Sequence, residues 1–216
     1  MKDSATGQGR RTKEQGTVPT GVAIRDAREQ LFGAAERILL RDGPSALTSR
    51  AVTTEAGCAK GVLHRHFADF DAFLAELVLD RVARVEARAD TLHAAAGTGT
   101  VTGNLTAVLT DLFESVAVAI VGLVTSRDGL RARLRKARPT GVPVLTEAAA
   151  MIASYLAAER DLGRVAADAD VGTLAPTLIG AAHLLFADRQ SAPPEPEAVG
   201  KVVATVVAGV VRDGRP

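Results

Sequence analysis

A short stretch, residues 56–66, mixes basic residues with small ones. Lys60 and Arg65 supply positive charge there, and Gly61 between them lets the backbone approach another molecule closely. Arg50 lies a few residues upstream. Arginine and lysine pair with the O6 and N7 atoms of guanine, and their charge also binds phosphates. These types at this spacing predict a surface that binds double-stranded DNA.

Two short helices must position these residues. Thr48 is a good N-cap for a helix that carries Val52 inward, and Ala56-Gly57 ends that helix after about two turns. A third helix is expected over roughly 59–66. Two short helices joined by a tight turn have the proportions of a helix-turn-helix, whose second helix enters the major groove.

Helical periodicity continues on both sides of this pair. A first helix starts near Ile24 and stops at Asp42-Gly43-Pro44, and Asp69 caps a long fourth helix. A flexible break over 96–103 follows. Further helices are expected over roughly 104–125, 127–138, 143–160, 171–189 and a last segment from Val199 to Val211.

Two details of these later helices are expectations in their own right. Pro176 fits a helix that starts near Thr173, because the first turn needs no N–H donor at that position. The paired valines between Val199 and Val211 form a wide apolar face, and a partner subunit is a good candidate to cover it. The whole chain is therefore expected to be all-α.

Composition limits the class of protein. The 216 residues are 47% hydrophobic and 24% charged, which is typical of a globular chain and excludes a wholly disordered or fibrous one. Net charge is +1 overall, yet residues 1–66 hold eleven Lys and Arg against seven Asp and Glu. This modest asymmetry has the sign expected for a DNA-binding end.

Location is predicted from cysteine and from apolar runs. Cys58 is the one cysteine and cannot form an intramolecular disulfide, so a reducing cytoplasm is expected. The N-terminal residues contain no apolar core, which argues against a secretory signal. The run over 115–125 is shorter than the roughly 20 residues that cross a bilayer, so no membrane partner is expected.

The segment from Leu47 to Leu74, LTSRAVTTEAGCAKGVLHRHFADFDAFL, resembles the DNA-binding segment of the TetR family of one-component regulators. With the preceding helix, the resemblance covers about 50 residues from Ile24. The features that match are Leu47-Thr48, Val52, Ala56-Gly57, Lys60-Gly61, Leu63, His66-Phe67 and Phe73-Leu74, together with Asp42-Gly43 upstream.

The resemblance implies an Ω-like dimer with an N-terminal helix-turn-helix head, a long fourth helix and a helical body that binds an effector. Carried over by position, the residues facing base edges are Ser49, Arg50, Lys60, Gly61 and Val62. Those facing phosphates are Thr48, His64, Arg65 and His66. Two positions depart from the family, which usually has Tyr at position 64 and Lys at position 70, where this chain has His64 and Phe70. Loss of a phosphate-binding cation lowers DNA affinity and flattens its salt dependence.

Three regions follow from this comparison. Residues 1–22 are expected to be a disordered arm, 23–70 the helix-turn-helix domain, and 71–216 the effector-binding and dimerisation domain. The expected partners are a palindromic operator, a second copy of the chain and a small, largely apolar effector. Repression, with release by the effector, is an expectation from the family.

Apolar residues of the body are candidates to line the effector pocket, with Tyr155 and His183 as polar groups that orient a ligand. The same residues also fit an ordinary core. The candidates are Leu109, Phe113, Val116, Met151, Tyr155, Leu178 and His183.

Two other functions compete with this hypothesis. An enzyme with an all-helical pocket is disfavoured, because the sequence contains no clear catalytic arrangement, no metal-ligand set and no cofactor-binding loop. His64 and His66 point about 200° apart on a helix, which argues against a metal site there. A helical dimeric interaction module that has lost DNA binding is the second alternative, and Phe70 and His64 are the features that favour it.

Overall fold

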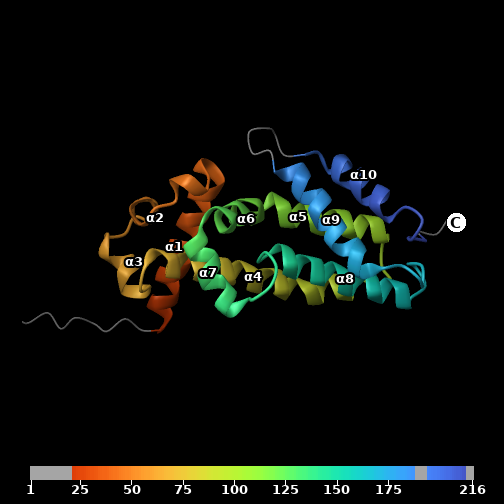
Figure 1. Ribbon diagram of the computed structural model, residues 1–216, viewed down its shortest axis with the longest axis horizontal. Coiled ribbons are helices and arrows are strands. Elements are labelled where there is room, and N and C mark those ends of the chain that lie inside the picture. Colours follow the sequence, from red (N-terminus) through yellow and green to blue (C-terminus); the bar gives the residue numbers. More distant parts are fainter. Residues whose placement is uncertain (1–20, 188–193, 213–216) are drawn as a thin grey trace, which may run out of the picture.

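The computed structural model describes residues 21–187 and 194–212, with side chains from residue 26 onward. Over these residues the chain is helical, with an isolated antiparallel bridge between Val165 and Val211. Figure 1 shows an elongated molecule with the first helices gathered at one end and the last helices towards the other. The expected all-α class is confirmed.

The N-terminal end, called the head here, contains α1 (Gly21–Asp42), the 3-10 turn η1 (Pro44–Ala46), α2 (Ser49–Glu55) and α3 (Gly61–His66). Gly43 ends α1 with a φ of 83°, a left-handed conformation that favours glycine. Residues 1–20 of the expected arm lie outside the described residues, and the last two residues of that arm already belong to α1.

Aromatic rings form the centre of the head. The ring of Phe67, just after α3, lies 5.0 Å from that of Phe73 in α4, and Phe32 of α1 lies 5.7 Å from Phe73. The guanidinium of Arg28 lies 4.6 Å from the centre of the Phe67 ring. The first turn of α4 therefore closes the core on which α3 rests.

The long helix α4 (Phe70–Ala94) connects the head with the rest of the molecule, called the body here. Asp69 caps it, since its Oδ1 accepts a hydrogen bond from the Ala72 amide at 2.7 Å. Along the helix, Nε of Arg84 lies 3.1 Å from Oδ2 of Asp80, one turn earlier. Both the cap and the length of this helix confirm the sequence prediction.

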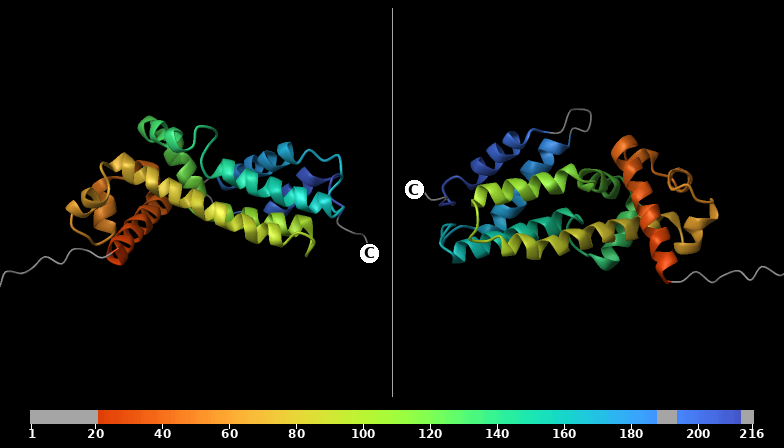
Figure 2. Two further views of the ribbon diagram at one scale, coloured as in Figure 1. Left: turned by 90° about the horizontal axis from the view of Figure 1, so that it is seen from below. Right: turned by 180° about the vertical axis from the view of Figure 1, so that it is seen from behind.

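The body is built around α4. Figure 2 shows α8 running alongside α4. α9 packs on α8 and α5, and α10 packs on α5 and α9. The elements of the body are α5 (Val101–Glu114), α6 (Ala117–Ser126), α7 (Asp128–Ala137), α8 (Leu145–Asp161), α9 (Val171–Phe186) and α10 (Pro196–Val207).

The prediction of a single helix over 104–125 is wrong, because the structure has two helices there. α5 and α6 meet at Ser115–Val116 with a bend of 55°. The hydroxyl of Ser115 donates to the carbonyl of Leu112, and the ψ of −172° at Ser115 takes the backbone out of the helix. A serine hydroxyl that binds nearby backbone competes with continuation of a helix.

The start of α9 also differs from the expectation. Asp170 caps the helix by accepting from the Thr173 amide at 3.1 Å, so α9 begins at Val171 and not near Thr173. Pro176 therefore lies in the second turn, where its missing N–H removes one helical hydrogen bond.

The last helix packs within its own chain. α10 ends at Val207, and Val199, Val203 and Val207 are buried against α5 and α9. Val211 lies beyond the helix, where it pairs with Val165. α5 and α9 of the same chain therefore cover these three valines, while Val202, Val206, Val210 and Val211 are half-buried, and the expectation that a partner subunit covers the valine face stays a prediction.

A buried polar network ties α5 and α8 together far from the head. The hydroxyl of Tyr155 donates to Oε1 of Glu159 at 2.6 Å and accepts from the Asn104 amide at 2.9 Å. Glu159 also accepts from the Gly97 amide at 3.2 Å and lies 3.4 Å from Nη1 of Arg164. Both Tyr155 and Glu159 have zero exposure, so these two side chains at the centre of the network are sealed from water.

Among the described residues, no single helix is long and apolar enough to cross a membrane, although the bent pair α5–α6 meets that test of length and composition.

Replacement of Phe73 by alanine is expected to destabilise the protein by about 3–5 kcal/mol, because it empties the centre of the aromatic cluster. Urea unfolding followed by circular dichroism measures the change. Leu162→Ala is the control, since Leu162 is 57% exposed. Equal stability of the two variants would contradict the central role of the cluster.

Tyr155→Phe is expected to lower the free energy of unfolding by about 1–3 kcal/mol, because Glu159 loses a buried hydrogen-bond donor. The same unfolding experiment measures it. In the control Thr205→Val, the lost hydroxyl is exposed and bonds the carbonyl of Lys201 on its own helix. A loss no larger than that of the control would show that the network contributes little.

Candidate nucleic-acid interface and effector site

α2 and α3 form the expected pair of short helices. Thr48 caps α2 by accepting from the Ala51 amide at 3.1 Å. The turn after α2 passes through Gly57, whose φ of 64° is left-handed. Val52 and Leu63 are fully buried beneath the two helices. The local sequence thus gives each helix a defined start, a defined end and one buried face.

The nine residues expected to face DNA divide by exposure. Ser49, Val62 and His66 are half-buried, and the ring of His66 lies 6.5 Å from that of Phe67. The other six are exposed and share the outer surface of the head, namely Thr48, Arg50, Lys60, Gly61, His64 and Arg65.

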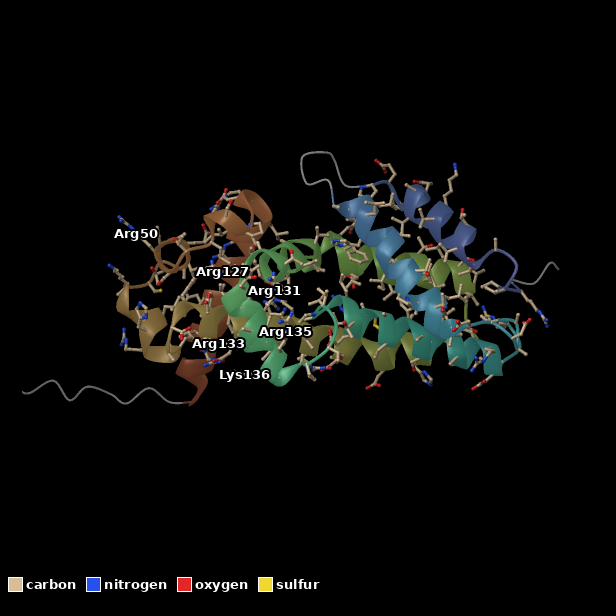
Figure 3. The ribbon with its side chains drawn as sticks, in the orientation of Figure 1. Arg50, Arg127, Arg131, Arg133, Arg135 and Lys136 are labelled. Carbon is tan, nitrogen blue, oxygen red and sulfur yellow. The ribbon has the colours of Figure 1, made fainter. Side chains whose placement is uncertain are left out.

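Arg50 is the exposed residue whose side chain is best placed to reach another molecule. Figure 3 shows its side chain at the outer edge of the head, pointing away from the body. Lys60 directly precedes α3, and Arg65 lies near its end. The arrangement presents several cations and few bulky apolar groups, which suits the approach of a polyanion.

Sequence reasoning missed the ion pairs that hold α2 against α1. Nε of Arg37 lies 2.8 Å from Oε1 of Glu55, and Nη1 of Arg41 lies 3.2 Å from Oε2 of the same carboxylate. Hydrogen bonds from these two arginines lower the pKa of Glu55. The signal was present, since Arg37 and Arg41 are four residues apart and share one face of α1.

The start of α4 is held by α7. Nη2 of Arg133 lies 2.8 Å from Oδ2 of Asp69, and Nη2 of Arg127 lies 2.9 Å from Oδ1 of Asp71. The hydrogen bond from the Ala72 amide, followed by the charge of Arg133, lowers the pKa of Asp69. Arg131 within the helix and Arg138 just after it also pair with carboxylates, so the cations of this segment are largely paired.

Phe70 is half-buried and stacks on Phe73 with 5.7 Å between ring centres. The guanidinium of Arg127 lies 5.6 Å from the centre of the Phe70 ring. A cation is therefore present beside position 70, but α7 supplies it. Arg135 and Lys136 of α7 have exposed side chains, and Figure 3 shows this helix beside the head.

The seven residues expected to bind an effector come from α5, the α5–α6 break, α8 and α9. His183 is half-buried and the other six are buried. Tyr155 belongs to the sealed network, where burial and then the hydrogen bond to Glu159 raise its pKa. Leu109, Met151 and Leu178 lie in the common core.

The structure brings Phe113 and His183 together. Their ring centres are 5.7 Å apart, and Phe186 stacks on the ring of Phe113 with 5.8 Å between ring centres. Nδ1 of His183 is buried and has no hydrogen-bond partner among the described residues. Burial lowers the pKa of this imidazole, so its neutral form is favoured. Val116 lies elsewhere, at the edge of a hollow between α1, α4 and α6.

The head of the chain matches a known protein family in sequence. Residues 31–77 match the model of the family described as bacterial regulatory proteins, tetR family. This range includes the end of α1, all of α2 and α3, and the first turns of α4. No curated protein matches the chain significantly in sequence.

Solved structures share the fold over most of the chain. FadR of Bacillus subtilis in complex with stearoyl-CoA has a TM-score of 0.62 at 16% identity, covering 84% of this chain and 98% of its own. Reduced NemR of Escherichia coli has a TM-score of 0.68 at 16% identity, with 86% and 97% covered. NalD, the secondary repressor of the MexAB-OprM efflux pump in Pseudomonas aeruginosa, has a TM-score of 0.57 at 16% identity, with 88% and 98% covered. The head therefore matches the model of the tetR family over residues 31–77, and most of the chain shares its fold with these solved structures.

Proposed function

We propose that this chain is a ligand-responsive transcriptional repressor, which binds a palindromic operator as a homodimer and leaves it when a small, largely apolar effector binds. The observation that carries the proposal is the outer surface of the head, where Arg50, Lys60 and Arg65 are exposed on a helix-turn-helix. In this proposal residues 23–70 bind DNA, and residues 71–216 bind the effector and the second subunit.

α3 is the element that enters the major groove in this proposal. Arg50 and Lys60 read guanines, while Thr48, His64 and Arg65 contact phosphates. Two heads in a dimer then reach half-sites about one helical turn, ~34 Å, apart or a small multiple of that. The surface that faces DNA is completed by Ser49, Gly61, Val62 and His66.

The exposed side of α9 supports a dimer. Leu184 is 76% exposed, which is unusual for a large apolar residue unless another surface covers it. Thr173, Thr177 and Gly180 are also exposed and recur with Leu184 at three-, four- and seven-residue steps on one face of the helix. Small residues around one leucine allow two copies of α9 to approach closely.

Control by a ligand needs a connection between body and head. The ion pairs of Arg127 and Arg133 join α7 to the first turn of α4, and α3 ends only a few residues earlier. A ligand that binds better to a second arrangement of the body therefore shifts the heads, in proportion to its difference in affinity for the two states.

Arg50→Ala and Lys60→Ala are each expected to weaken operator binding by about 1–3 kcal/mol, because each removes a contact to a base edge. Fluorescence anisotropy with the intergenic DNA upstream of the protein's own gene, over a series of salt concentrations, measures this. Lys201→Ala, an exposed cation on α10, is the control. Weak binding that ignores sequence and is equal in all variants would favour the interaction module without DNA binding.

Phe70→Lys is expected to tighten operator binding and to steepen the dependence of log K on log salt by about one unit per head. The variant also loses stability, since it gives up a ring stack and puts a second cation beside Arg127. Phe70→Leu is the matched control, which disturbs the stack without adding charge. Equal salt slopes for the two variants would show that position 70 does not approach phosphate.

A further inference from the structure

A hollow of about 200 Å³ lies where the head joins the body. α1 and α4 supply one part of its wall, and the break between α5 and α6 supplies another, in the region where these helices converge (Figure 2). The residues that line it include the cations Arg81, Arg84 and Arg88 and the apolar Val85, Leu112 and Val116. It is separate from the Phe113–His183 contact.

Arg81 is the unusual member of this wall. Its exposure is only 7%, and its Nε and Nη1 atoms are buried, each beside a carboxylate oxygen. Glu36 of α1 and Asp80 lie within ion-pair range of the same guanidinium. Guanidinium stays charged in proteins, so this buried cation depends on an anion beside it.

Two further arginines follow on the same face of α4, three and seven residues after Arg81. Arg84 is held by Asp80 at 3.1 Å and Arg88 by Asp111 at 2.9 Å. Both pairs are largely exposed, and such pairs contribute little stability, so these arginines can turn towards another anion at small cost.

The first turn of α6 also faces the hollow. Val116 is the N-cap residue and has no side-chain acceptor, and the hydroxyl of Ser115 accepts from the Ala117 amide only at 3.4 Å. Val116 and Ala117 line the hollow, so the positive end of the α6 dipole acts in the same direction as the arginines.

Glu36 is the one carboxylate among the residues that line the hollow. Burial raises its pKa, and the charge of Arg81 only partly opposes this shift. The ionised form of Glu36 is therefore less favoured here than in water, although it faces a permanent cation. A carboxylate brought by a ligand could satisfy Arg81 without the restraint of α1.

We infer that this hollow binds a small monocarboxylic acid, whose carboxylate replaces that of Glu36 at Arg81. Its apolar part would lie against Leu112, Val116 and Val85. The volume is below the roughly 300–1,000 Å³ of sites for drug-sized ligands, which restricts the occupant to a short chain or a single ring. The inference thus specifies that the largely apolar effector of the proposed function carries an anionic carboxylate.

The consequence for regulation rests on the proposed function. Glu36 lies in α1 of the head and Arg81 in α4, so their ion pair is a tie across the joint. A ligand that takes the place of Glu36 removes this tie and frees α1 to move relative to α4.

Isothermal titration of the full-length protein with hexanoate and benzoate tests the site. Both acids are expected to bind, and hexanamide and benzamide about tenfold more weakly, because a neutral amide forgoes the charge-assisted contact. Arg84→Gln and Arg88→Gln are each expected to weaken the acids several-fold, up to about tenfold. Arg160→Gln, on α8 and outside the lining residues, is the control and keeps the wild-type affinity.

Glu36→Gln tests the replacement itself. Removal of the competing carboxylate is expected to tighten hexanoate binding several-fold. Glu76→Gln is the matched control, because Glu76 forms a different ion pair between α4 and α1, with Arg28. The control leaves hexanoate affinity unchanged. Unchanged or weaker binding in Glu36→Gln would overturn the replacement by a ligand carboxylate.

Three further results would overturn the site: no heat from either acid at about 10 mM, wild-type affinity in both Arg84→Gln and Arg88→Gln, or inorganic phosphate binding as tightly as hexanoate. Operator binding by the protein without any acid is measured in parallel. Failure of the acids to bind while the operator binds removes only this inference. Failure of operator binding while the acids bind removes the proposed function and leaves the site.

Discussion

One carboxylate, that of Asp69, lies where the head, α4 and α7 meet. Its Oδ1 accepts from the Ala72 amide and so starts α4, and its Oδ2 is held by Arg133 of α7. Because a helix end needs partners for its free amides, the direction in which α4 leaves the head is set here. Phe73, one turn later, places α4 in the core on which α3 rests. The geometry of the DNA-facing surface therefore depends on a contact made by the body.

Local features of the fold could be predicted because their causes are local. Thr48 and Asp69 were recognisable as caps, Gly43 and Gly57 as places where a helix ends, and the apolar spacing gave the helices of the head to within a few residues. The break at Ser115 was missed because the apolar pattern runs through it without interruption. A hydroxyl that turns back on the backbone leaves no mark in hydrophobic periodicity.

The joint between head and body could not be predicted for a different reason. The partners of Arg81, Arg127 and Arg133, which are Glu36, Asp71 and Asp69, lie far away in the sequence. Ion pairs of this kind follow from the packing of helices, which a single sequence does not contain. The same limit applies to α10, where the sequence does not reveal that α5 and α9 of the same chain cover Val199, Val203 and Val207.

The sealed network around Tyr155 has an optical consequence. The chain has no tryptophan and a single tyrosine, and that tyrosine lies in the body with zero exposure. The aromatic rings of the head are phenylalanines, which absorb and emit far more weakly at the wavelengths used to follow tyrosine. Near-ultraviolet ellipticity and intrinsic fluorescence of this protein therefore report on α5 and α8 alone. Melting of the head would pass unseen at those wavelengths, so these signals follow the body by itself without any attached dye.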